Sequence, residues 1–193
     1  MQFKSKRNDV LLVNGVVEKH HRTAQAAAQE AQNLMGLHKA GVRVPQLITV
    51  QDNILHIEYI PGATIPDLLE QLEAHPNSDT RKKATNKIVE WLQSFYNATG
   101  AARGDINGRN FLFDGESIWG VDFEEPLTGV CAPAIDIGRL MAFVQTYTPQ
   151  GTPIKRQFAN MLMQEAIQEF GISAVEILHH RDTELQAMLT RRQ

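Results

Sequence analysis

Three polar side chains surround a predicted β-hairpin in the segment ARGDINGRNFLFDGESIWGVDFEE, residues 101–124. Asp105 precedes the hairpin, and Asn110 and Asp122 stand symmetrically about its predicted turn. Pairing of the apolar runs on either side should bring Asn110 and Asp122 to the same open end. Carboxylate and amide oxygens are the hard ligands that Mg²⁺ prefers, so this spacing predicts a magnesium site. Asp105 and Asn110 taken alone would more simply cap turns, and the spacing to Asp122 favours the metal site.

A second group that could do chemistry joins a predicted strand to a predicted helix. Glu30 shares one helix face with Ala27 and Leu34. A buried carboxylate needs a cation, or its pKa rises and it becomes neutral. Lys19 ends the predicted strand with its side chain on the same face as Val17. We therefore expect an ion pair between Lys19 and Glu30, although a surface Lys and a surface Glu on a polar helix explain the pattern equally well.

The N-terminal part of the sequence predicts two hairpins with a helix between them. The stretch VLLVNGVVEKHH contains two β-rich runs around Asn14-Gly15, a pair that supplies the positive φ angles of a type I′ turn. Thr23 is a good N-cap and Gly41 a good C-terminal stop for the helix that follows. The stretch QLITVQDNILHIEYI then predicts a second hairpin that turns at Asp52-Asn53.

The remainder of the sequence predicts helices with one embedded hairpin. After a break at Pro61-Gly62, the pattern indicates a short helix near 66–72 and then a long helix behind a Ser78/Asp79 cap. The embedded hairpin turns near Asp114-Gly115. After Pro133 the periodicity is helical to the end, with two interruptions.

This order of elements predicts an α+β fold in two lobes. A chain of 193 residues with 42% hydrophobic and 21% charged residues suits one globular domain. We expect a single domain over 1–193. Its N-lobe, residues 1–60, would hold antiparallel strands plus one helix, and its C-lobe, residues 61–193, would be mainly helical with the embedded hairpin.

Together these residues resemble the protein-kinase-like family. VVEKHH is similar to the strand that carries the phosphate-binding lysine, here Lys19, and Glu30 falls where the family's helix glutamate pairs with it. RGDINGRN is similar to the catalytic loop, and VDFE to the metal-binding Asp-Phe-Gly site. The resemblance implies that Asp105 accepts the proton of an acceptor hydroxyl, and that Asn110 and Asp122 bind Mg²⁺ or Mn²⁺.

The resemblance runs from about residue 10 to residue 144 and extends to the nucleotide base. LHIEYIPG is similar to the family's hinge, with Ile57 as gatekeeper and the backbone of Glu58 and Ile60 facing the adenine of ATP. Asp136, in APAIDIGRL, falls where aminoglycoside- and choline-kinase relatives have an aspartate that steadies the catalytic loop. These similarities imply a two-lobed kinase-like fold with ATP between the lobes.

Within the family, the chain looks similar to the smallest atypical kinases. These are the kinase subunit of the KEOPS tRNA-modification complex and, more distantly, the RIO and lipopolysaccharide kinases. The stretch EAQNLMGLHKAGVRVPQLI resembles their Glu-Ala…Gly-Val-x-Val-Pro stretch, and no long activation loop follows Asp122. The resemblance implies an ATP- and Mg²⁺-dependent phosphotransferase, either an atypical Ser/Thr protein kinase or an ATPase of the KEOPS-kinase type.

Three departures from the family pattern keep other functions open. Nine residues precede the first predicted hairpin, so we expect no room for a full strand and a Gly-rich phosphate loop. Asn107 stands where Ser/Thr protein kinases usually carry a lysine, and Glu124 stands where the metal motif usually has its glycine. The last two changes favour a small-molecule phosphotransferase of the aminoglycoside- or choline-kinase kind. The first favours a pseudokinase that acts as an interaction module.

Charge and residue composition limit the partners that we expect. A formal net charge of −3 argues against direct nucleic-acid binding, although Lys4–Arg7 and Arg191-Arg192 are local basic groups. The expected partners are a nucleotide, an unidentified protein or small-molecule phosphoryl acceptor, and a further protein. We find no apolar run long enough for a membrane span and no signal sequence, so we expect no membrane association.

The few cysteine and histidine residues do not predict a metal centre. Cys131 is the single cysteine of the sequence, which excludes an internal disulfide and suits a reducing cytoplasm. We expect His20-His21 and His179-His180 to be exposed polar residues rather than metal ligands.

Overall fold

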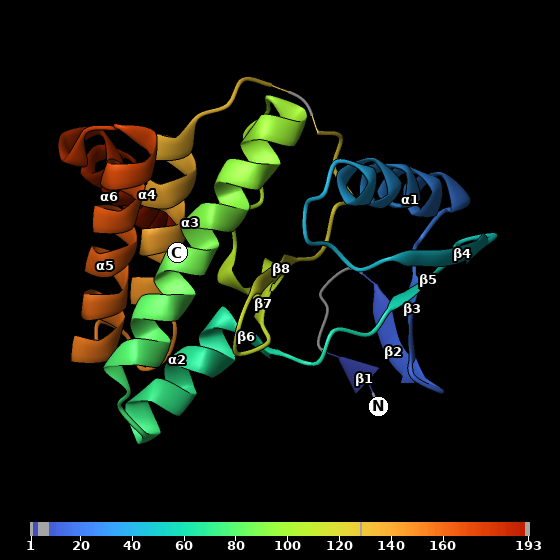
Figure 1. Ribbon diagram of the computed structural model, residues 1–193, viewed down its shortest axis with the longest axis horizontal. Helices are drawn as coiled ribbons and strands as arrows, with labels where there is room; N and C mark the ends of the chain where they lie inside the picture. The colour runs from blue at the N-terminus through green and yellow to red at the C-terminus, as the bar shows by residue number, and fades with distance from the viewer. Residues whose placement is uncertain (1, 4–7, 128, 192–193) are drawn as a thin grey trace.

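The computed structural model describes residues 2–3, 8–127 and 129–191 and confirms the predicted α+β architecture. Figure 1 shows a sheet and helix α1 at one side, helices α3–α6 at the other, and a small hairpin between them. The sheet is antiparallel with the order β1-β2-β3-β5-β4. Its strands are β1 (Gln2–Phe3), β2 (Asp9–Val13), β3 (Val16–His20), β4 (Leu47–Gln51) and β5 (Ile54–Glu58).

Both hairpins predicted in the N-terminal part are present. Asn14 and Gly15 have φ angles of 50° and 83°, as a type I′ turn requires, and they join β2 to β3. Asp52, with φ of 52°, begins the turn between β4 and β5. The turn residues therefore account for the pairing of β2 with β3 and of β4 with β5.

A short strand of two residues, β1, precedes the first hairpin, where the sequence predicts no room for a full strand and a Gly-rich loop. β1 pairs with β2, with Gln2 opposite Leu11 and Phe3 opposite Val10. The sequence between these two strands contains no glycine. The basic group Lys4–Arg7 lies in this connection and falls outside the described residues.

Helix α1 (Ala24–Lys39) buries the stripe that the sequence predicts. The Thr23 side chain caps it by accepting a hydrogen bond from the backbone N–H of Ala26. Its buried residues are Ala27, Glu30, Ala31, Leu34 and Leu37. The helix contacts β4 and β5, so Glu30 faces the sheet from within an apolar stripe.

The C-terminal part is helical, as predicted. Its helices are α2 (Ile65–Ala74), α3 (Ser78–Thr99), α4 (Pro133–Thr146), α5 (Pro153–Phe170) and α6 (Ala174–Thr190). The cap of α3 differs from the predicted Ser78/Asp79, because Asn77 Oδ1 accepts hydrogen bonds from the backbone N–H groups of Asp79 and Thr80. No helix within the described ranges is both long and apolar enough to cross a membrane.

The embedded hairpin belongs to a three-stranded sheet with the order β6-β7-β8. Its strands are β6 (Ala63–Thr64), β7 (Phe111–Phe113) and β8 (Ile118–Gly120). The register differs by one position from the predicted symmetry. Phe111 pairs with Gly120, and the backbone of Asn110 therefore accepts a hydrogen bond from Val121 N, not from Asp122. Asp122 then leaves the strand direction with φ of 67°.

An aromatic cluster holds this hairpin against α3. The Trp91 ring lies 5.3 Å from those of Phe95 and Phe111, and its Nε1–H donates to Arg43 O at 2.8 Å. A Cβ atom placed on Gly120 would lie 2.2 Å from the Trp91 ring. The close approach of strand and ring requires glycine at this position.

We expect Gly120→Ala to destabilise the protein by about 1–3 kcal/mol, because the added methyl group overpacks the site against a rigid indole. The measurement is the free energy of unfolding in urea. Gly36→Ala is the matched control, since a Cβ there meets nothing within 4 Å in an exposed part of α1. The control should be more stable by about 0.5–1 kcal/mol. Equal stability of Gly120→Ala and wild type would contradict the packing argument.

Candidate functional site

A buried lysine lies at the centre of the site, in contact with three carboxylates. Lys19 Nζ lies 2.8 Å from Glu30 Oε2, 2.6 Å from Asp122 Oδ1 and 2.8 Å from Glu124 Oε1. The predicted Lys19–Glu30 ion pair is therefore present, and the Lys19 side chain is 8% exposed. Alternation along β3 turns Lys19 inward together with Val17. The lysine thus joins the sheet, α1 and the segment after β8.

The electrostatics of this group favour the charged forms of Lys19, Glu30 and Asp122. Burial would lower the pKa of Lys19, but the attraction of Glu30 and Asp122 outweighs burial and raises the pKa above its usual range. Burial would raise the pKa of Glu30, but hydrogen bonding from His21 and the attraction of Lys19 lower it instead. Burial also opposes ionisation of Asp122, and Lys19 again lowers the pKa. The result is an ammonium group surrounded by ionised carboxylates.

Helix α1 also holds the segment that carries Asp122 through hydrogen bonds to its backbone. Glu30 Oε1 accepts from Phe123 N at 3.1 Å. Asn33 Nδ2, one turn further along the helix, donates to Phe123 O at 2.8 Å and to Glu125 O at 3.0 Å. These three bonds fix the segment on both sides of Phe123, so Asp122 and α1 are positioned together.

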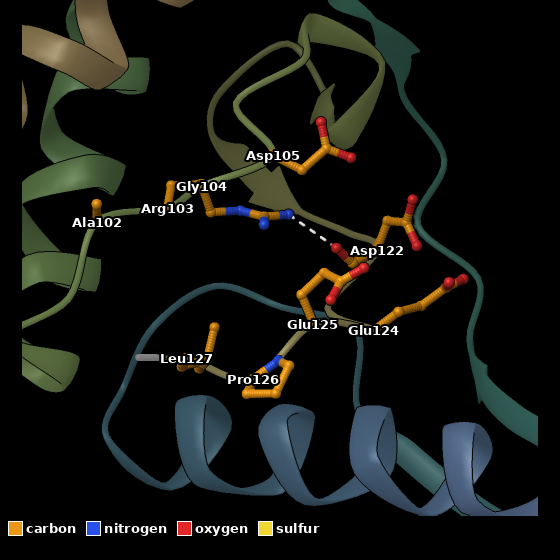
Figure 2. A pocket seen from close by; sticks show the side chains of 9 residues that line it. All are labelled: Ala102, Arg103, Gly104, Asp105, Asp122, Glu124, Glu125, Pro126 and Leu127. Carbon is orange, nitrogen blue, oxygen red and sulfur yellow. Dashed lines mark hydrogen bonds between the residues drawn. The ribbon is translucent and has the colours of Figure 1, made fainter. Parts of the chain in front are cut away.

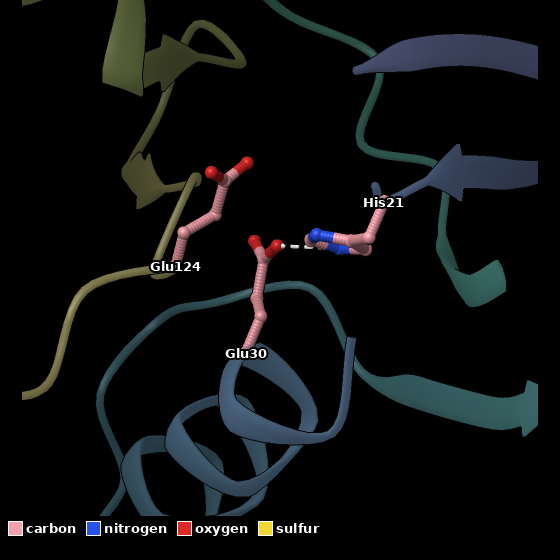
Figure 3. A group of neighbouring side chains, drawn as sticks. All are labelled: His21, Glu30 and Glu124. Atoms are coloured by element: carbon pink, nitrogen blue, oxygen red, sulfur yellow. Dashed lines mark ion pairs between the residues drawn. The ribbon is translucent and has the colours of Figure 1, made fainter. Parts of the chain in front are cut away.

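His21 joins this group, and the expectation that it is exposed is wrong. Its side chain is 1% exposed, and its Nε2 lies 3.1 Å from Glu30 Oε2. Figure 3 shows His21, Glu30 and Glu124 converging from three different segments, with possible ligand atoms within 4.8 Å of one another. Lys19 Nζ already lies against both carboxylates of this trio. The cluster is therefore balanced by the lysine and does not need a metal ion.

Arg103, at the start of the predicted catalytic loop, connects that loop to the segment that carries Asp122. Its Nη2 donates to Val121 O at 2.8 Å and to Asp122 O at 2.9 Å, and its guanidinium lies 4.3 Å from the centre of the Phe123 ring. The Arg103 side chain reaches between Asp105 and Asp122 in Figure 2. Burial lowers the pKa of Arg103 from its usual value, although nearby carboxylates, Asp105 first, oppose the shift.

Asp136, on α4, holds the other side of the same loop. Its Oδ2 accepts from the backbone N–H of Arg103 at 2.7 Å and from the Tyr96 hydroxyl at 2.9 Å. The residue is 0% exposed, and burial raises the pKa of its carboxyl. These contacts fit the supporting role that the resemblance implies, which stays a prediction.

Asp105 and Asn110, on the predicted catalytic loop, differ strongly in exposure. Asp105 is exposed, whereas Asn110 is 7% exposed and donates from Nδ2 to Asp105 O at 3.1 Å. A cavity of about 260 Å³ is lined by Asp105, Asp122, Glu124 and Glu125, with Arg103 at its wall (Figure 2). The amide oxygen of Asn110 and the ionised carboxylate of Asp122 are suitable ligands for Mg²⁺. The donor set therefore fits the predicted metal, and the metal site itself remains a prediction.

The predicted adenine-binding residues lie at the end of β5 and just after it. Ile57 and Ile60 are 8% and 6% exposed, and Glu58 is exposed. Glu58 N donates to Gln46 O at 2.9 Å, and the Glu58 carboxylate accepts from Gln46 N at 3.1 Å. The backbone N–H of Glu58 is thus used within the sheet, and the roles of Glu58 and Ile60 toward adenine stay predictions.

Comparison with protein families supports the same assignment. Residues 4–128 match the family described as RIO domain. The chain belongs to the RIO-domain family. The matched range contains Lys19, Glu30, Asp105, Asn110 and Asp122, and it ends before α4. A RIO domain is kinase-like, so family membership agrees with the predicted class of fold and supports kinase chemistry in general.

Comparisons with individual proteins give less information about this chain than the family match does. A solved structure of a choline/ethanolamine kinase family protein from Mesorhizobium loti is similar over 97% of this chain and 85% of that one, with 16% sequence identity and a TM-score of 0.49. No match was found among curated protein sequences.

Acid should lower the free energy of unfolding, because it protonates the carboxylates around Lys19. The pKa values of Glu30 and Asp122 are lowered on folding from the ordinary 4.5 and 3.8, so their stabilisation is complete above pH 4.5 and is lost as pH falls through the lowered values. We expect the free energy of unfolding of Lys19→Met to fall less steeply with decreasing pH, because Glu30 and Asp122 in this variant lack the cation that lowers their pKa values. Urea unfolding measured at several pH values below 5 tests this. Parallel curves for the two proteins would contradict it.

Proposed function

We propose that this RIO domain is an ATP- and Mg²⁺-dependent phosphotransferase of the atypical kinase type. The observation that carries the proposal is the buried ammonium of Lys19, held by Glu30 of α1 and in contact with Asp122. A cation fixed in this way beside ionised carboxylates suits recognition of a polyphosphate with its divalent ion. Family membership supports kinase chemistry in general.

Lys19 would bind the α- and β-phosphates of ATP. Phosphate oxygens would replace Asp122 and Glu124 as partners of the ammonium, while Glu30 keeps its hold from α1. Asn110 and Asp122 would hold Mg²⁺ or Mn²⁺, which neutralises charge on the phosphates when bound. The hinge residues Glu58 and Ile60 would face the adenine through their backbone.

Asp105 would orient an acceptor hydroxyl and accept its proton. The acceptor oxygen then forms a bond to the γ-phosphorus, the bond between that phosphorus and the bridging oxygen breaks, and ADP leaves. Asp105 is exposed on the wall of the acidic cavity, where an acceptor can approach it. Most of the acceleration comes from positioning and charge neutralisation, with base catalysis adding roughly 10²–10⁴-fold.

We expect Asp105→Ala to slow phosphoryl transfer by roughly 10²–10⁴-fold while nucleotide affinity changes little, because the side chain acts on the acceptor and not on the nucleotide. Transfer or hydrolysis of labelled ATP and nucleotide titration measure the two effects separately. Asp182→Ala, on the surface of α6, is the matched control. A variant that retains the wild-type rate would remove Asp105 from its proposed role.

The acceptor proposed first is a Ser or Thr hydroxyl of a protein, or water in an ATPase, by the likeness to the KEOPS kinase. A small-molecule acceptor is the second candidate, favoured by Asn107 in place of the usual lysine. The Asn107 side chain accepts hydrogen bonds from the Tyr147 hydroxyl at 2.8 Å and from Arg109 N at 3.0 Å. These bonds hold the Asn107 side chain in place within the loop. A screen of acceptors with labelled ATP distinguishes the two.

ATP with Mg²⁺ should raise the thermal unfolding midpoint of the wild type, because a ligand that binds only the folded state stabilises it, by about 2.7 kcal/mol at 100 times its dissociation constant. Lys19→Met should remove most of this shift. Lys87→Met, which changes a surface lysine paired with Glu90, should retain it. The absence of any shift at millimolar nucleotide would favour the pseudokinase interpretation, in which the domain serves only for protein interaction.

A further inference from the structure

A second cavity, of about 350 Å³, lies beside the predicted catalytic loop. Asn107 and Arg109 line it from the loop, Tyr147 and Thr148 line it from the end of α4, and Arg191 lines it from the end of α6. A volume in this range suits a small molecule or a part of one. Neither the family match nor the predicted nucleotide site assigns a function to it.

The two cavities lined by the predicted catalytic loop differ in the sign of their charge. The first is lined by four carboxylates, those of Asp105, Asp122, Glu124 and Glu125, and by one arginine. The described residues that line the second include two arginines and no acidic residue. Charged clefts concentrate ligands of the opposite sign, so the second cavity is suited to an anion and the first to a cation.

The wall of the second cavity presents hydrogen-bond donors. Tyr147 Oη donates to Asn107 Oδ1 and accepts from Gly108 N at 3.0 Å, and Asn107 Oδ1 also accepts from Arg109 N. These bonds use the carbonyl oxygen of Asn107 and leave its NH₂ group without a partner among the described residues. Burial raises the pKa of Tyr147, so its hydroxyl stays neutral. The wall therefore offers N–H donors without a competing negative charge.

The two guanidinium groups differ in what already neutralises them. The Arg109 side chain is exposed and makes no hydrogen bond or ion pair with any described residue. Arg191 Nη2 lies 2.6 Å from Glu184 Oε1, but Arg139 shares the same carboxylate at 3.7 Å. Arg139 and Arg191 thus share one carboxylate, and Arg109 has no acidic partner among the described residues, so positive charge exceeds negative charge among these groups.

We propose that the second cavity binds the phosphate or carboxylate group of a small-molecule phosphoryl acceptor. Arg109 and Arg191 pair with the oxyanion, and the Asn107 NH₂ group donates to it. Asn107 follows Asp105 by two residues, a span of at most about 7 Å, so an anion held here keeps a hydroxyl of the same molecule within reach of Asp105. The inference rests on the proposed phosphoryl transfer and narrows its acceptor to the second candidate class.

The test is calorimetric titration of the full chain with inorganic phosphate, in the wild type and in three variants. We expect Arg109→Gln to weaken phosphate binding about tenfold, since charged pairs of this kind contribute on the order of 1.4 kcal/mol. Lys19→Met, which alters the proposed nucleotide site, should bind phosphate as the wild type does. Arg22→Gln, an exposed arginine before α1, is the matched control and should also bind normally.

The inference is overturned if the wild type binds no phosphate at tens of millimolar, if Arg109→Gln binds it normally, or if Lys19→Met abolishes binding. The thermal shift with ATP and Mg²⁺, measured on the same proteins, separates this failure from failure of the proposed function. If Arg109→Gln keeps the thermal shift with nucleotide and also binds phosphate as the wild type does, only the anion-site proposal is refuted. If the wild type shows no thermal shift with ATP and Mg²⁺, the proposed phosphotransferase function is refuted, while phosphate binding would still show an anion site.

Discussion

One buried ammonium group organises the site of this RIO domain. Lys19 lies among Glu30, Asp122 and Glu124, and the buried charges of Lys19 and Glu30 would each be costly without the other. Removing one partner of a buried pair typically costs about 3–5 kcal/mol, because it leaves an uncompensated charge. The same charges are suited to a ligand that carries its own anions and cations, since phosphates can replace carboxylates and a divalent ion can replace the ammonium beside Asp122.

The rest of the structure keeps that group in register. Asn33 and Glu30 hold α1 against the backbone around Phe123, and Arg103 holds the predicted catalytic loop against the same segment. Asp136 in turn holds the backbone of Arg103. Sheet, helix and loop therefore meet at Asp122 and Phe123, so a shift of any one of them changes the others. This coupling explains why the polar residues of the site come from widely separated parts of the sequence.

Much of this could be predicted from sequence because the relevant signals are local. Asn14-Gly15 specifies its own turn, and the periodicity of α1 shows Glu30 within an apolar stripe. The sequence could not predict the pairing of β1, because a strand of two residues is too short to show an alternating apolar and polar pattern. The hairpin register shifted by one position because Asp114 Oδ1 accepts from both Glu116 N and Ser117 N and so sets the turn. The contacts of Asn33 and the burial of His21 depend on packing between distant segments, which no local pattern encodes.

In the proposed function, the metal ion and triphosphate would occupy the acidic cavity that Asp105 lines, and an anionic acceptor would occupy the basic cavity lined by Asn107 and Arg109. The most direct test of the central claim is a crystal structure with Mg²⁺ and a nonhydrolysable ATP analogue. The account predicts Lys19 bonded to phosphate oxygens and to Glu30, with the metal ion on Asn110 and Asp122. A nucleotide bound elsewhere, with Lys19 still held by Asp122 and Glu124, would contradict it.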